Sequence, residues 1–240
     1  VVDGLFVSNL VGDMALSAVN IIFPVSMIIG AFGFMLGTGG SAIVARTLGE
    51  GRRELAQRYF SMIIYAVILL GGALTVVSVW LTEPIARLAG ASDVLIRDCV
   101  IYGRILLLGS VPFMLQVCFQ SFFVVAERPQ LGLAYSIAAG VTNMVLDYLL
   151  IAVFHLGIAG AAIATVLSQL ASCLFVLRFL FGPVPPLRIT FGGYSLHTML
   201  RVLLTGLTPF VIIAVDNVMI IALNAVLQRY GGPEQGDLLV

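Results

Sequence analysis

The chain is a series of long apolar segments separated by short polar ones. Six segments have the length that a membrane-spanning helix needs, about 20 residues. A shorter apolar stretch precedes them and is expected to be the end of a truncated first helix. The predicted spans are residues 14–45, 59–81, 105–126, 131–153, 158–180 and 200–227, after the helix end at 1–10.

Composition agrees with this pattern. Of 240 residues, 60% are hydrophobic and only 10% are charged, whereas a soluble domain carries about 25% charged residues. The chain is therefore predicted to be an all-α integral membrane protein. Its net charge is zero and it has no basic stripe, so nucleic acid is not an expected partner. The three cysteines stand far apart, without the spacing of metal ligands.

The charges of the connecting segments predict the orientation in the membrane. Eight arginines fall on one side of the predicted spans and four on the other, so the richer side is expected to be cytoplasmic. The loops at 46–58, 127–129 and 182–197 then face the cytoplasm of a multi-pass protein of the plasma (inner) membrane. The turns near Gly12 and Leu156 face outward.

Residues 182–197 form the clearest linker, because they contain three prolines and a pair of glycines. The predicted division is a first membrane lobe at 1–181, a cytoplasmic inter-lobe loop at 182–197, and the first helix of a second lobe with its tail at 198–240. A faint internal echo supports this division, since Val2-Asp3 recurs as Val215-Asp216.

Prolines and glycines mark places where the helices are expected to bend or pack closely. Pro24 and the glycine run from Gly30 to Gly40 predict a kinked second helix that its neighbours approach closely. Pro112 and Pro209 are expected to bend their helices as well.

The candidate chemistry centres on Asp147, a carboxylate in apolar surroundings. Residues 129–146 and 148–177 contain no Asp, Glu, Lys or Arg. Asn143 lies one helical turn earlier on the same face, and Thr165 lies in the following segment. If the turn is centred near Leu156, both Asp147 and Thr165 sit roughly 13 Å below the same membrane surface. An acid at that depth costs about 2.5–3.5 kcal/mol, so a cation, a proton or a polar partner is expected to compensate it.

Two further acidic residues in the predicted helices are candidates for the same chemistry. Asp3, about nine residues before the turn at Gly12, is expected at the depth of Asp147 and Thr165. Asp216 lies within the last span and is a candidate second-lobe acid.

Four stretches of the sequence resemble the multidrug and toxic compound extrusion (MATE) family, in the order and spacing of that family. They run through most of the chain. They are VDGLFVSNLVGD at 2–13 with its continuation to Pro24, GTGGSAIVARTLGEG at 37–51, NMVLDYLLI at 143–151 and GIAGAAIATVLSQ at 157–169.

This resemblance implies twelve helices in two six-helix lobes, of which the chain would supply most of the first lobe and the first helix of the second. The missing second-lobe helices would then be a partner of this fragment. The resemblance also implies export of small organic cations or drugs in exchange for external H⁺ or Na⁺. It assigns the cation site to Asp3, Asn143, Asp147 and Thr165; an acid at Asp216 departs from the expected pattern.

The expected function is therefore a secondary active antiporter, not an enzyme, with H⁺ or Na⁺ as coupling ion and no resident cofactor. Two carboxylates, an amide and a hydroxyl suit Na⁺, whereas H⁺ needs only a carboxylate with a raised pKa. One alternative is a flippase for lipid-linked oligosaccharides, which would need cationic groups in its cavity. A second is a membrane aspartyl hydrolase, but neither Asp3 nor Asp147 lies in a Gly-x-Gly-Asp setting. A third is an inactive fragment of a transporter.

Overall fold

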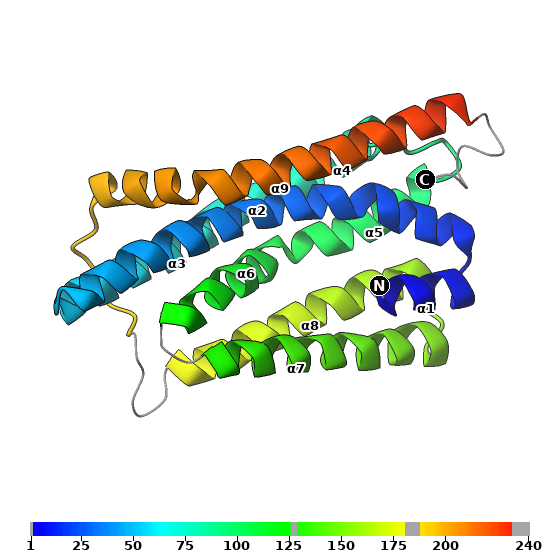
Figure 1. Cartoon of the computed structure of the whole chain (residues 1–240). Helices are drawn as coiled ribbons and strands as arrows, with labels where there is room; N and C mark the ends of the chain where they lie inside the picture. The colour runs from blue at the N-terminus through cyan, green and yellow to red at the C-terminus, as the bar shows by residue number, and fades with distance from the viewer. Residues whose placement is uncertain (1, 126–128, 181–187, 232–240) are drawn as a thin grey trace.

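The computed structural model describes residues 2–125, 129–180 and 188–231, and every regular element in those residues is helical (Figure 1). The all-α prediction is therefore confirmed. The side chain of Asp3 lies outside the described residues. The helices are α1 (Val2–Leu10), α2 (Asp13–Gly49), α3 (Arg53–Trp80), α4 (Thr82–Leu88), α5 (Ile96–Leu108), α6 (Ser110–Val125), α7 (Pro129–Asp147), the π-helix η1 (Tyr148–Val153), α8 (Gly157–Leu180) and α9 (Leu196–Tyr230).

The connections between the helices gather at the two ends of an elongated bundle (Figure 1). We call one the hairpin end; it holds the turns at 11–12 and 154–156 and the segment 89–95. We call the other the arginine end; it holds the turn at 50–52 and the segment 188–195. Because α2 has 37 residues, it is about 55 Å long and extends beyond a hydrocarbon core of about 30 Å. The described arginines at the arginine end are Arg46, Arg52, Arg53, Arg58, Arg178, Arg188 and Arg201.

Helix α2 is the central helix, and its glycines let α6 approach it closely. A β-carbon at Gly33 would lie 2.7 Å from the carbonyl oxygen of Met114, and one at Gly37 would lie 2.8 Å from Cα of Cys118. Side chains at these two positions would collide with the backbone of α6. The predicted close approach of neighbouring helices to this glycine run is confirmed.

The same run also brings α9 against α2. A β-carbon at Gly39 would collide with the carbonyl oxygen of Val202, and one at Gly206 with that of Met35. Farther along the pair, the Asn224 amide donates a hydrogen bond to the carbonyl oxygen of Asn20 at 3.3 Å. Helices α2 and α9 are therefore in contact over much of their length.

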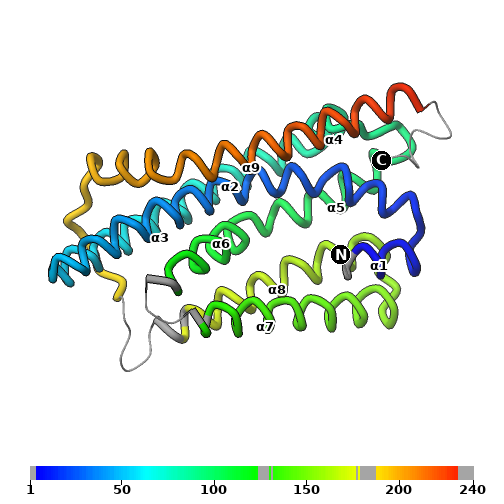
Figure 2. The backbone as a smooth tube through the Cα atoms, in the orientation of Figure 1, coloured from blue at the N-terminus to red at the C-terminus, as the bar shows by residue number. Residues whose placement is uncertain are grey.

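Helices α5 and α6 form one broken span, bent by 54° at Gly109 (Figure 2). Pro112 explains the break, because it has no N–H to donate to the carbonyl oxygen of Leu108 and its ring clashes with that oxygen. The predicted bend at Pro112 is confirmed. Pro24 and Pro209 lie within helices that continue on both sides of them, and the bends expected at these two prolines stay predictions.

Two predicted boundaries were wrong, and both errors have the same cause. The third span was expected from residue 105, after a connection at 82–104, but α5 begins at Ile96 and α4 occupies much of the connection. The loop expected at 46–58 is helical except at 50–52, where Gly51 adopts a φ of 76° that favours glycine. Charged residues show where a helix leaves the apolar layer; they do not end the helix.

The segment 188–195, which precedes α9, packs against α3. The N–H of Thr190 donates to the hydroxyl of Ser61 at 2.7 Å, and the ring of Phe191 lies 5.8 Å from that of Tyr65. Ser195 then caps α9 by accepting from the N–H of Thr198 at 3.3 Å. The rest of the predicted linker, and the turn at 127–129 up to residue 128, lie outside the described residues.

Candidate ion-binding site

Asp147 is the last residue of α7, and its side chain is 0% exposed. The sequence around it supplies no basic residue over the lengths of α7 and α8 up to residue 177. A carboxylate in such surroundings is costly when ionised, so its charge must be offset by a cation, a proton or oriented polar groups. The structure shows that Asp147 is buried, as its isolation among apolar residues of the sequence suggests.

A π-helix, η1, follows Asp147 directly. The N–H of Phe154 donates to the carbonyl oxygen of Leu149 at 2.9 Å, which is the five-residue spacing of a π turn. The hairpin then closes at His155, whose φ is 52°, and the N–H of Leu156 bonds the carbonyl oxygen of Leu150 at 3.0 Å. Such π segments are rare and frequently occur at functional sites.

Thr165 and Asn143 are both half-buried. The Thr165 hydroxyl donates to the carbonyl oxygen of Ala161 at 3.1 Å, one turn earlier in α8. That bond uses the only proton of the hydroxyl and leaves the oxygen lone pairs for another donor or a cation. Because α7 and α8 pack together as a hairpin, Asp147 and Thr165 lie on neighbouring helices (Figure 1).

Helix α1 packs against α7, η1 and α8 as well as against α2. The structure therefore brings the helix that carries Asp3 beside the helices that carry the other three predicted site residues. The position of the Asp3 carboxylate lies outside the described residues.

Asp216 is not part of this group. It lies on α9, on the other side of α2 from α7 and α8 in Figure 1, and its side chain is exposed. The structure thus separates Asp216 from Asp147.

Sequence reasoning overlooked a buried polar stripe on α8 that continues from Thr165 towards the arginine end. Ser168, Gln169 and Ser172 are 6%, 8% and 5% exposed. The Ser168 hydroxyl donates to the carbonyl oxygen of Thr165, and that of Ser172 to the carbonyl oxygen of Ser168, both at 2.8 Å. The spacing of three, four and seven residues from Thr165 was a signal that could have revealed one polar face.

Outside the membrane-spanning segments, the hairpin end carries an exposed charge cluster. Arg87 donates to Asp93 at 2.9 Å and to Glu83 at 3.4 Å. These hydrogen bonds raise the pKa of the Arg87 guanidinium above its usual value, so this arginine stays charged. Exposed pairs of this kind contribute little to stability.

Comparison with known proteins decides the family. The sequence model of the MatE family matches residues 1–149, more than half of the chain. The chain belongs to the MatE family. The resemblance seen in the sequence motifs is thereby confirmed.

Individual MatE relatives agree with this assignment over nearly the whole chain. The multidrug export protein MepA of Staphylococcus saprophyticus is 25% identical over 228 residues, which are 94% of this chain and 51% of that protein. A MATE multidrug resistance transporter solved in an inward-facing conformation is 27% identical, with a TM-score of 0.92 over 99% of this chain and 54% of its own. The MATE multidrug transporter DinF-BH is 30% identical, with a TM-score of 0.89 over 96% of this chain and 52% of its own.

The chain spans about half the length of the curated relatives it matches. Its fold is that of half a MATE transporter, and its described residues contain five long apolar helices together with the broken span α5–α6. The predicted fold, a six-helix lobe with a short first helix and one further helix, is confirmed.

Proposed function

We propose that this chain forms one lobe of an antiporter that exports small organic cations or drugs in exchange for H⁺ or Na⁺. Membership of the MatE family and relatives named for multidrug export support the transport of drugs. The observation that carries the coupling site is the fully buried Asp147 carboxylate in the apolar layer. These features favour a transporter over an enzyme.

The proposed coupling site consists of Asp3, Asn143, Asp147 and Thr165. Na⁺ binds oxygen ligands, and this set offers two carboxylates, an amide oxygen and a hydroxyl oxygen. H⁺ would instead bind one carboxylate directly. Either ion neutralises charge that the apolar surroundings disfavour, so ion binding is coupled to the packing of α1, α7 and α8.

Exchange then follows from competition. With both carboxylates ionised, the site is negatively charged and holds an organic cation. Entry of H⁺ or Na⁺ from outside removes that charge, which weakens the attraction for the organic cation and favours its release. The exposed Asp216 is proposed to add a negative charge along the path, because an acid on an apolar helix is costly when it faces lipid.

We further propose that the protein lies in the plasma (inner) membrane with the arginine end in the cytoplasm. The excess of arginine at that end supports this orientation. The hairpin end, with α1 and Asp147 nearest to it, then faces outward, where the coupling ion enters.

The test uses everted membrane vesicles that carry the transporter with and without Asp147→Asn. Uptake of a fluorescent cationic dye is followed while H⁺ and Na⁺ gradients are imposed separately. We expect uptake to respond to one of the two gradients and to be lost in Asp147→Asn. The matched control is Asp93→Asn, which also removes one negative charge. The Asp93 side chain is 91% exposed and lies in the segment 89–95 at the hairpin end. Dye uptake that survives Asp147→Asn at its original rate would reduce Asp147 to a structural role.

A further inference from the structure

A pocket of about 760 Å³ opens at the arginine end between the end of α2, the start of α3 and the start of α9. The residues that each helix contributes recur at intervals of three or four positions, so they lie on one face of that helix. Helix α2 contributes Arg46 and Thr47, the turn after it contributes Glu50 and Arg52, and α9 contributes Thr198, Arg201 and Thr205. The pocket is therefore built from the ends of three helices, which fix the backbone positions of its lining residues.

The lining of this pocket is basic. Arg46, Arg52 and Arg201 line it from three different segments, and Glu50 is the only acid among the described residues that line it. Glu50 contacts Nε of Arg46 at 3.2 Å and Nη1 of Arg52 at 3.7 Å. Because each guanidinium has five N–H donors, both arginines keep donors for a further anion. The positive charge of Arg201 adds to this excess.

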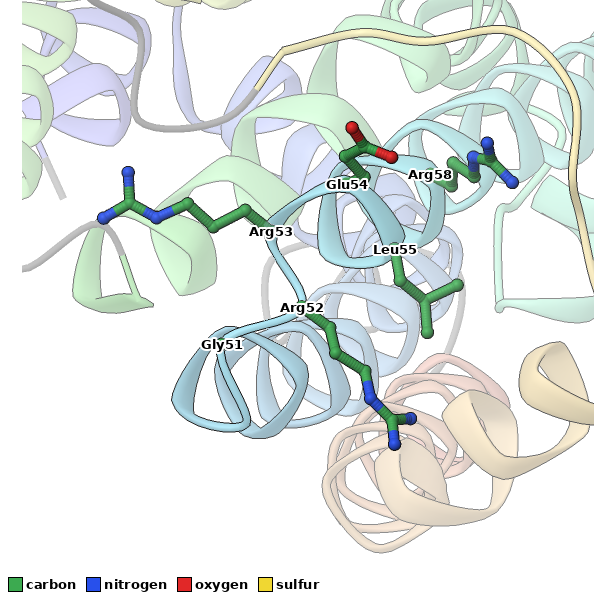
Figure 3. Close-up of a pocket in the computed structure, with 6 residues that line it drawn as sticks. All are labelled: Gly51, Arg52, Arg53, Glu54, Leu55 and Arg58. Atoms are coloured by element: carbon green, nitrogen blue, oxygen red, sulfur yellow. The ribbon is translucent and has the colours of Figure 1, made fainter.

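Arg52 and its neighbour Arg53 point in opposite directions (Figure 3). The Arg52 side chain extends towards α9, whereas Arg53 extends away from it. Arg53 lines an adjacent pocket of about 480 Å³ that shares Arg52 with the first. The two arginines thus carry the same charge in the same turn, but only Arg52 reaches the pocket beside α9.

An exposed apolar ridge leads away from the pocket along α9. Leu204 lines the pocket and is 69% exposed. Leu200, Leu207 and Val211 are also exposed and lie on the same face as Leu204. A basic pocket joined to an apolar ridge matches a molecule with an anionic head and a hydrocarbon tail.

We propose that this pocket binds the phosphate of an anionic phospholipid, with an acyl chain lying along the ridge from Leu200 to Val211. Basic pockets between membrane helices bind such head groups, and guanidinium groups pair well with phosphate oxygens. The proposal depends on the chain crossing a membrane and is independent of the transported substrate or coupling ion.

The experiment titrates the purified protein in detergent with dioleoylphosphatidylglycerol and follows lipid-bound species by native mass spectrometry. We expect Arg52→Gln and Arg201→Gln each to weaken binding about fivefold, as the loss of one basic residue near an anionic surface implies. Arg53→Gln is the matched control and should leave binding within about twofold, well below that loss. Arg46→Gln provides a third pocket variant, and circular dichroism checks that every variant keeps its helical content.

Three results would overturn the proposal. If Arg53→Gln weakens binding as much as Arg52→Gln, the lipid responds only to the general charge of the arginine end. If inorganic phosphate or glycerol phosphate binds as tightly as the lipid and is weakened by the same variants, the pocket recognises a soluble anion. Equal binding of dioleoylphosphatidylcholine would also contradict the requirement for an anionic lipid.

Discussion

At the scale of single residues, the burial of the Asp147 carboxylate has a large energetic consequence. Moving an acid into the apolar layer costs about 2.5–3.5 kcal/mol, which is a substantial fraction of the stability of a typical domain. Thr165 lies on the neighbouring helix with its hydroxyl proton already donated to Ala161. An oxygen in that state acts as an acceptor or a cation ligand rather than as a donor.

Substitutions at Thr165 separate the ligand role of its oxygen from its packing. Thr165→Val keeps the branched shape but removes the oxygen, so we expect the concentration of coupling ion that half-saturates transport to rise about tenfold. Thr165→Ser keeps the oxygen and should change that concentration by less than about threefold. The measurement is the initial rate of dye transport against ion concentration. An equal effect of both substitutions would favour a packing role.

The residues of the candidate site could be predicted in part from the sequence. Asp147 stood out because no charged residue surrounds it for many positions, and that isolation corresponds to burial in the structure. The polar stripe on α8, by contrast, was not evident from the sequence. Serine is common in apolar spans, because its hydroxyl can donate a hydrogen bond to a carbonyl oxygen of its own helix, as Ser168 and Ser172 do here. The π-helix after Asp147 depends on tertiary packing, for which a single sequence gives no signal.

At the scale of elements, the glycines of α2 decide how closely the helices pack. Gly39→Ala places a methyl group against the carbonyl oxygen of Val202, so α9 must move away from α2. We expect this substitution to destabilise the protein by about 1–3 kcal/mol, the usual cost of overpacking. Thermal unfolding in detergent, followed by circular dichroism, measures the effect.

Gly72→Ala is the matched control for this prediction. Gly72 lies inside α3, and a β-carbon there would have nothing within 4 Å. Replacing a glycine in an open helical position by alanine should stabilise the helix by about 0.5–1 kcal/mol. Unfolding temperatures that fall equally for Gly39→Ala and Gly72→Ala would show that the α2–α9 contact is not the cause.

The sequence predicted the existence of the helices better than their ends. Apolar length reveals a span because the hydrocarbon layer demands it, but a helix continues beyond that layer until a residue such as Gly51 or Gly90 turns the chain. The bend at Gly109 followed from Pro112, whose missing N–H is a local property. Pro24 and Pro209 lie inside continuous helices, so a proline does not by itself end a helix.

At the scale of the whole molecule, the distribution of arginine and aromatic residues relates the bundle to a membrane. Trp80 and Tyr230 are 87% and 81% exposed at the hairpin end, and Tyr194 is 45% exposed at the arginine end. Exposed aromatic side chains at both ends are typical of the two membrane–water interfaces.

The proposed orientation predicts which end a membrane-impermeant thiol reagent can reach. The three native cysteines are buried, and a variant without them provides the background. In intact cells we expect labelling of Leu88→Cys, at the hairpin end, where the native side chain is 78% exposed. Glu54→Cys, at the arginine end, should be labelled only after the membrane is made permeable. The reverse pattern would invert the orientation.

The glycines of α2 differ in whether a second substitution could make room for a larger residue in their place. At Gly40 the nearest neighbour is the side chain of Ile63, so a smaller residue at 63 could make room for a larger one at 40. At Gly39 and Gly206 the neighbours are the carbonyl oxygens of Val202 and Met35, which every amino acid possesses. No second substitution at 202 or 35 can restore the lost space. A larger residue at position 39 or 206 therefore cannot be compensated by a second substitution at 202 or 35. Such a residue can be accommodated only if α2 and α9 lie farther apart.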